Sequence, residues 1–256
     1  MPENNQFQDP NIVRLLWTSG WDSTFRLLQL VVEKGATVLP IYIISDRASS
    51  PIEIETMNKI KKLTHKLFPE TVNRILPTVF YAQYDIKKYP EVTVKHRILT
   101  NQSYLGSQYE WLSRYAKQHD ITDLELSIHT DDRAYEFMKS FVVKNEDQHG
   151  SYYALDPAVG DDNPLSLFRP FRLPMLEWTK VEMKEHALKI GTFEIMNLTW
   201  FCHAPRNGKP CGLCNPCKYS MQEGMAFRFP KESLLRYRLA PAYSKVVKLL
   251  RIIKVK

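Results

Sequence analysis

The sequence has no apolar run near the ~20 residues that a membrane-spanning helix needs. Its longest apolar stretches, such as Val38 to Ile44, have the length of strands. The segment from Met1 to Asp9 is polar and lacks the apolar core of a secretory signal. Internal repeats and low-complexity tracts are also missing, which excludes solenoid and low-complexity proteins. With 44% hydrophobic and 12% aromatic residues in 256, the composition is that of a globular protein, which we expect to be cytoplasmic.

Positive charge is in excess, with 35 Lys and Arg against 28 Asp and Glu and a net charge of +7, but it is not spread evenly. Residues 228–256 contain nine basic residues and one acid, so residues 1–227 carry a net charge of −1. From Ser244 to Lys256, Lys or Arg recurs at every third position between aliphatic residues. This pattern predicts a helix with one apolar and one basic face, which either docks on the protein body or binds nucleic acid or acidic lipid.

Apolar runs of strand length alternate with helical patterns along most of the chain. The expected strands are Ile12–Trp17, Thr37–Ile44, Val79–Tyr81 and Leu124–Ile128. The first expected helix begins at Thr24 and has Gly35 as its C-cap. Two more begin at capping boxes, one at Ser50–Glu53 that runs to about Leu67 and one at Thr179–Glu182 that runs to about Ile190. The remaining two are Tyr104–Lys117 and Arg133–Val143. The segment Asn145–Pro164 is expected to be a long loop. This order predicts an α/β domain over residues 10–195, with a parallel sheet that binds ligands at the carboxyl ends of its strands.

All four cysteines lie in one short segment, with the spacing C-x8-C-x2-C-x2-C: Cys202, Cys211, Cys214 and Cys217. Cysteines clustered this closely in a reducing compartment bind metal more often than they form disulfides. Four soft thiolates suit a closed tetrahedral Zn²⁺ site, and an iron–sulfur cluster uses the same ligands. We expect a structural zinc site in residues 196–256, followed by the basic tail, with His203 outside the ligand set. Since no cysteine lies elsewhere, thiol catalysis is not expected.

The segment from Thr18 to Thr24 is small and polar and joins the first expected strand to the first expected helix. It has neither the G-K-[ST] ending of a Walker A loop nor the G-x-G-x-x-G spacing. Small residues let successive N–H groups and the helix N-terminus face a phosphate, and hydroxyl groups add donors. Asp22 either braces such a loop or approaches a Mg²⁺ ion held by the phosphates. An anion-binding loop and an ordinary strand–helix turn both fit this segment.

Two motifs carry a resemblance to a known family. Thr18 to Ser23 resembles the Ser-Gly-Gly-x-Asp-Ser pyrophosphate loop of the N-type ATP pyrophosphatases. Thr199–Cys202 and Cys211–Cys217 look like the zinc segment of the 7-cyano-7-deazaguanine synthase family within that group. Further positions stand where that family has matching residues, namely Glu53, Glu55, Pro174, Thr179, Lys180 and Gly191. The resemblance implies a Rossmann-like, doubly wound sheet of the adenine nucleotide alpha hydrolase type.

The resemblance also implies an activity, because this family uses ATP and ammonia to convert 7-carboxy-7-deazaguanine into a nitrile. It implies an ATP-dependent carbon–nitrogen ligase that uses ATP, Mg²⁺ and Zn²⁺, takes ammonia and a deazaguanine-type carboxylate, and forms a homodimer. The residues that it assigns to ATP are Thr18, Ser19, Gly20, Trp21, Asp22, Ser23 and Thr24. Those that it assigns to catalysis are Asp22, Ser23, Asp131 and Lys180. Plain helix caps remain an alternative for Thr179 and for the acidic pair Asp131–Asp132.

The sequence departs from the family pattern mainly outside the loop and the cysteines. Thr18 and Ser19 replace a Ser and a Gly, whereas Tyr104–Leu105 replaces Arg-Asn, Ser127–Asp132 replaces Gly-x-Asn-x-Glu-Asp, and Ser220 replaces an Arg. Three hypotheses follow. The protein is a deazaguanine-type ligase, or it adenylates a different acceptor such as another carboxylate, a protein terminus or a nucleic acid, or it is a non-catalytic, zinc-stabilised binding module.

Overall fold

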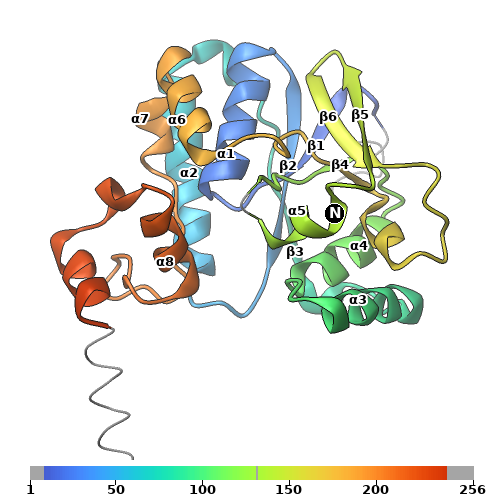
Figure 1. Cartoon of the computed structure of the whole chain (residues 1–256). Coiled ribbons are helices and arrows are strands. Elements are labelled where there is room, and N and C mark those ends of the chain that lie inside the picture. The colour runs from blue at the N-terminus through green and yellow to red at the C-terminus, as the bar shows by residue number, and fades with distance from the viewer. Residues whose placement is uncertain (1–8, 131, 241–256) are drawn as a thin grey trace, which may run out of the picture.

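The computed structural model describes residues 9–130 and 132–240. At its centre lies a five-stranded sheet with the spatial order β3–β2–β1–β4–β7. Its strands are β1 (Ile12–Leu16), β2 (Thr37–Ile44), β3 (Val79–Ala82), β4 (Leu124–Glu125) and β7 (Phe171–Arg172). All neighbouring strands in this sheet run parallel. The predicted fold class, an α/β protein with a Rossmann-like parallel sheet, is confirmed (Figure 1).

Helices cover both faces of the sheet, as Figure 1 shows. One face packs against α1 (Trp21–Leu28), α2 (Ser50–Leu67), α6 (Lys180–Lys189) and α7 (Phe193–Met196). The other packs against α3 (Pro90–Gln102), α4 (Gln108–Gln118) and α5 (Arg133–Met138). Strand β2 serves both cores, because Val38 and Tyr42 belong to the first and Leu39, Ile41 and Ile43 to the second. Burial on both faces explains why this strand is a continuous apolar run.

Shorter elements complete the described chain. They are η2 (Gln29–Glu33, a π-helical continuation of α1), η3 (Pro69–Thr71), η4 (Gln83–Asp85), η5 (Pro164–Phe168), α8 (Asn215–Gln222), η6 (Ala226–Arg228) and a helix over residues 231–240. The basic helix predicted from Ser244 onward lies outside the described residues. Within the described part, no helix combines the length and apolarity required to cross a membrane.

The loop expected over Asn145–Pro164 is wrong in its first part. There β5 (Val142–Asp147) and β6 (Gly150–Leu155) form an antiparallel hairpin, and an isolated bridge joins Tyr153 to Leu173 beside the sheet edge. Because most side chains of both strands are polar or half-exposed, they lack the apolar alternation that marks a strand. The helix expected over Arg133–Val143 accordingly ends at Met138, where the chain turns into β5.

Of the two capping boxes predicted from the sequence, the structure confirms one. The capping box at Thr179 is confirmed, because its hydroxyl accepts from the Glu182 N–H and the Glu182 carboxylate accepts from the Thr179 N–H. The one expected at Ser50 is wrong: its hydroxyl donates to the Ser45 carbonyl, while Glu53 accepts from the Tyr42 hydroxyl.

Helix α3 was not expected from the sequence. It buries only Val92 and Leu99, so its apolar periodicity is weak. The helix expected over Tyr104–Lys117 instead begins at Gln108, and α1 begins at Trp21, earlier than Thr24.

Candidate nucleotide site and four-cysteine centre

The segment from Thr18 to Ser23 leaves the carboxyl end of β1 and enters α1. Ser19 adopts φ of +55°, a left-handed conformation that glycine tolerates better than serine. Its carbonyl accepts a hydrogen bond of 2.9 Å from the backbone N–H of Trp200. Across the segment, the Ser23 hydroxyl accepts from the Thr18 N–H at 3.3 Å. These contacts hold the predicted phosphate loop in a tight turn at a helix N-terminus.

Three polar atoms of this loop are buried without a hydrogen-bond partner among the described residues. They are Ser19 Oγ, Trp21 Nε1 and Asp22 Oδ1. An unsatisfied buried polar atom destabilises a fold by about 1–3 kcal/mol, so a concentration of them marks a place prepared for another group. The Thr24 side chain is different, because it is fully buried and its hydroxyl accepts from Trp17 Nε1 at 3.0 Å. Thr24 therefore supports the loop from beneath.

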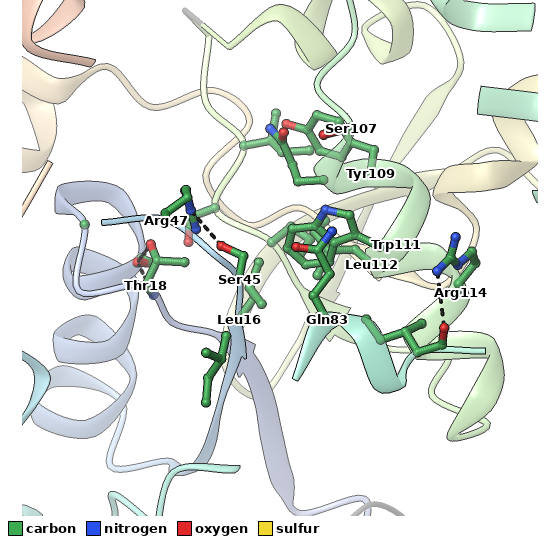
Figure 2. Close-up of a pocket in the computed structure, with 18 of the residues that line it drawn as sticks. Leu16, Thr18, Ser45, Arg47, Gln83, Ser107, Tyr109, Trp111, Leu112 and Arg114 are labelled. Carbon is green, nitrogen blue, oxygen red and sulfur yellow. Dashed lines mark hydrogen bonds between the residues drawn. The ribbon is translucent and has the colours of Figure 1, made fainter. Parts of the chain in front are cut away.

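A cavity of about 1030 Å³ opens in front of the loop, at the carboxyl ends of β1, β2 and β3 and beyond β4. Thr18, Gly20, Asp22 and Ser23 line it. Figure 2 shows Thr18 with Ser45 and Arg47 on one side and residues of α4, including Tyr109 and Trp111, on the other. Parallel α/β sheets bind ligands at this edge, so the cavity lies where the sequence predicted it.

Two cations lie near the Asp22 carboxylate. Lys180, at the start of α6, forms an ion pair of 2.6 Å with Glu223. Burial acts to lower the pKa of Lys180, but Asp22 and Glu223 outweigh it and the pKa is raised. Burial lowers the pKa of Arg228 to about 10, and Asp22 opposes this change. Both side chains therefore stay protonated at neutral pH. The sequence indicated Lys180 but not Arg228 or Glu223, which belong to the segment around and after α8.

A third cation borders the cavity at the end of β2. Arg47 Nε donates to the Ser45 hydroxyl at 3.0 Å, and Arg47 Nη1 lies 3.4 Å from His203 Nε2. His203 also lines the cavity, so the cysteine segment contributes directly to its wall. Arg47 was not singled out in the sequence, although its position just after a buried strand is a signal for a site residue in this fold.

Of the acidic pair beyond β4, Asp131 and Asp132, the structure describes only the second residue. Asp131 lies outside the described residues. Asp132 lines the cavity and caps α5, because its Oδ1 accepts from the Ala134 N–H at 2.9 Å and from the Tyr109 hydroxyl at 3.0 Å. The helix-cap interpretation is confirmed for Asp132. His129, on the same connection, places Nε2 3.8 Å from Asp22 Oδ2.

The four cysteines come together as their spacing predicted. Their sulfur atoms lie within 4.8 Å of one another, with separations of 3.8 Å for Cys211–Cys217 and 3.9 Å for Cys202–Cys214. A tetrahedral Zn²⁺ site with Zn–S bonds of about 2.3 Å places sulfurs ~3.8 Å apart. Backbone N–H groups donate to the sulfur atoms of Cys202 and Cys211. The donor set and its spacing fit one tetrahedral ion.

The helix over residues 231–240 supports this centre from outside. Arg236 donates to the carbonyl of Cys211 at 2.8 Å and to that of Pro210 at 3.2 Å. Gly212 has φ of +77°, and a Cβ there would overlap the Ser233 carbonyl. The backbone around the second and third cysteines therefore has a fixed path.

Comparisons with known proteins give matches among solved structures only. No protein-family model matches the chain, and no curated protein matches its sequence. Among solved structures, it is similar to a 4-thiouridine synthetase in complex with RNA and bound ATP, at 16% sequence identity and a TM-score of 0.35. The similarity covers 89% of this chain and 53% of that one, so this chain spans about half of the length of that protein.

Proposed function

We propose that the protein is an enzyme that cleaves ATP between its α and β phosphates, attaches AMP to an acceptor oxygen and releases pyrophosphate. The observation that carries this proposal is the turn from Thr18 to Ser23, which lines a large cavity with Thr18, Gly20, Asp22 and Ser23 and leaves the buried Asp22 Oδ1 without a hydrogen-bond partner among the described residues. The loop resemblance described above supplies the reaction type.

The phosphates of ATP would lie against the loop. Backbone N–H groups at the start of α1 and the hydroxyls of Thr18 and Ser23 supply donors, and the helix dipole favours negative charge there. Arg47 adds positive charge at the cavity wall, and Lys180 adds it near Asp22. Donors and cations held in place before reaction stabilise the charge that develops on the departing pyrophosphate.

Asp22 would hold a Mg²⁺ ion together with the phosphates. Its buried and unpartnered Oδ1 is an oxygen ligand of the type that Mg²⁺ prefers. When bound, such an ion neutralises phosphate charge and polarises phosphoryl oxygens. The chain's own contribution is to fix the carboxylate at the first turn of α1, beside the cavity.

The acceptor would react in two steps. A carboxylate oxygen attacks the α-phosphorus, the new O–P bond forms as the bond to the β-phosphate oxygen breaks, and pyrophosphate leaves with the electron pair. Ammonia then attacks the carbonyl carbon of the acyl adenylate and loses a proton to solvent, and AMP leaves with the electron pair of the C–O bond, which gives an amide. A nitrile would require a second ATP, which adenylates the amide oxygen so that it leaves as AMP while the nitrogen loses its two protons. The first step makes a poor electrophile reactive. The family resemblance points to 7-carboxy-7-deazaguanine as this acceptor.

A different acceptor is the second candidate. It is favoured by the sequence departures at Tyr104–Leu105 and Ser127–Asp132 and by the rim of the cavity, where the Tyr84 side chain is 86% exposed. An open rim with an exposed aromatic ring suits a substrate that extends into solvent, such as a nucleic acid or a protein terminus.

The four cysteines would hold a structural Zn²⁺ ion. Four thiolate ligands leave no open position for substrate. The donor set lies next to the cavity through His203, but it contributes folding energy and not a reacting group.

A product assay tests the reaction type. Purified protein is incubated with ATP, Mg²⁺ and separate acceptors: 7-carboxy-7-deazaguanine with ammonia, other carboxylates, peptides and RNA. AMP and pyrophosphate in equal amounts, dependent on one acceptor, support the proposal and identify the substrate. ADP and phosphate contradict it. Salt-sensitive RNA binding with no ATP turnover on any acceptor also contradicts it and favours a binding module.

A further inference from the structure

The side chain of Arg228 lies between two aromatic rings from distant parts of the chain. Its guanidinium carbon is 5.0 Å from the ring centroid of Trp21 and 4.7 Å from that of Phe201. Both distances fall within the ~6 Å of a cation–π contact. Trp21 is the first residue of α1 in the candidate nucleotide loop, and Phe201 directly precedes the first cysteine. Arg228 therefore contacts both sites at once.

Polar contacts strengthen this connection. Arg228 Nη2 donates to both the carbonyl and the hydroxyl oxygen of Thr199. The adjacent Trp200 donates its backbone N–H to the Ser19 carbonyl at 2.9 Å. Segment 199–201 thus holds the loop on one side and continues into Cys202 on the other. The Asp22 carboxylate is close enough to influence the charge of Arg228.

A second ion pair follows the same route. Glu223, at the end of α8, lies beyond the last cysteine and pairs with Lys180 at 2.6 Å. Lys180 in turn lies near Asp22. Two charged side chains that follow the last cysteine, Arg228 and Glu223, therefore connect the four-cysteine segment to the loop, the second through Lys180. A metal-binding unit that acts independently of the loop would not require these contacts.

We propose that Arg228 is a positioning residue, which transmits the fold of the four-cysteine segment to the loop from Thr18 to Thr24. Metal binding would fix segment 199–201 and η6, and Arg228 would then hold Trp21 in the position that leaves Gly20, Asp22 and Ser23 facing the cavity. The kinetic part of this inference rests on the proposed ATP-dependent function, whereas the structural part does not.

Matched variants separate this role from a general contribution to stability. Arg228→Met removes the guanidinium, and Arg228→Lys keeps the charge but not the planar fork. Arg236→Met is the matched control, because the hydrogen bonds of Arg236 within the described part of the chain go to the Cys211 and Pro210 carbonyls and the Ser233 hydroxyl, and not to the loop. Arg238→Met controls for loss of an exposed positive charge.

The main readout is amide hydrogen exchange of peptides that cover residues 17–28, measured in protein whose bound zinc has been quantified. With zinc retained, we expect Arg228→Met to speed exchange in the loop by about 10-fold or more, with Arg228→Lys between it and wild type. At saturating zinc, Arg236→Met and Arg238→Met should show wild-type exchange there. Wild-type exchange in zinc-loaded Arg228→Met would overturn the proposal.

A second measurement keeps the test decisive if Arg228→Met does not fold. Zinc is removed from wild-type protein with a chelator, and exchange is compared between residues 17–28 and the hairpin β5–β6. Faster exchange confined to the loop supports the proposal, and an unchanged loop contradicts it. In kinetic assays, Arg228→Met should raise KM for ATP by about 10-fold with a smaller change in kcat. Absence of ATP turnover in wild type would refute the proposed function but leave the exchange experiment decisive.

Discussion

The backbone N–H of Trp200 donates to the carbonyl oxygen of Ser19, and the two residues belong to the motifs that are most informative in the sequence. Ser19 lies in the candidate phosphate loop, and Trp200 lies two residues before the first cysteine. The loop conformation therefore depends on a segment far along the chain.

Replacing Ser19 by glycine should stabilise the protein. The φ of +55° is unfavourable for a serine, and its buried Oγ has no partner among the described residues. We expect Ser19→Gly to raise the free energy of unfolding by about 1 kcal/mol, and Ser19→Ala, which keeps the Cβ, to give no such gain. Urea denaturation measures both. A less stable glycine variant would show that the serine hydroxyl contributes more than the backbone strain.

Replacing Asp22 by asparagine should remove activity without unfolding the chain. The substitution preserves shape but removes the charge that would hold Mg²⁺ beside the phosphates. We expect pyrophosphate release to fall by about 100-fold or more, with a melting temperature near that of wild type. The control is Glu136→Gln on the exposed surface of α5, where the carboxylate pairs with Lys139. Undiminished pyrophosphate release in Asp22→Asn would exclude a role for this carboxylate.

Removing the proposed Zn²⁺ ion should destabilise the fold around the cysteines. Four clustered thiolates without a cation repel one another, and metal binding contributes folding energy directly. We expect chelation, or Cys214→Ser, to lower the free energy of unfolding by about 3 kcal/mol or more. Thermal unfolding with metal analysis of each sample is the measurement. An unchanged melting temperature after verified metal removal would refute a structural role.

Replacing Gly212 by alanine should be far more damaging than the same change at Gly208. Both glycines have positive φ, +77° and +70°, so alanine is strained at either position. At Gly212 the new Cβ also overlaps the Ser233 carbonyl, whereas at Gly208 no atom lies within 4 Å. We expect a loss of about 3 kcal/mol or more for Gly212→Ala and about 1 kcal/mol for Gly208→Ala. Equal losses in urea denaturation would mean that the carbonyl moves aside.

The contribution of Lys61 to stability should depend on pH. Its ammonium donates to the Leu76 carbonyl and to the Thr78 hydroxyl, but burial lowers its pKa to about 8. Between this value and the ordinary 10.5, the unfolded chain binds more protons than the folded one, so stability from this group rises with pH. Lys61→Met should lack that rise. Urea denaturation from about pH 7 to pH 10 checks it, and parallel curves for both proteins would contradict it.

The sequence predicted two kinds of element: strands that are buried on both faces, and helix caps formed by residues that are close in the sequence. Strands β1 and β2 were visible because burial on both faces makes them almost continuously apolar, with Arg14 as the charged exception in β1. The two capping boxes show the limit of such patterns, since they read alike in sequence. Thr179 and Glu182 bond each other, whereas the Tyr42 hydroxyl from β2 takes the Glu53 carboxylate. The contact between Tyr42 and Glu53 is visible only in the folded structure.

In the candidate site, residues within short motifs were predictable, and residues brought together by distant segments were not. The loop and the cysteines were predictable, because small residues after a buried strand and closely spaced thiols carry their chemistry in short segments. The assignment of Thr18 to Thr24 to ATP stays a prediction, and so does that of Asp22, Ser23, Asp131 and Lys180 to catalysis. Arg228 and Glu223 were not found, because their contacts with Trp21 and Lys180 join segments far apart in the sequence. Periodicity and spacing carry no information about such pairs.

The hydrogen bond between Ser19 and Trp200 also has a consequence for how the chain folds. During synthesis, β1, β2 and β3 leave the ribosome long before residue 200 does, and local contacts form faster than contacts of high sequence separation. The central strands can pair while the turn after β1 still lacks its partner. Completion of that turn would then be a late event, limited by synthesis of the cysteine segment and by the supply of metal in the cell.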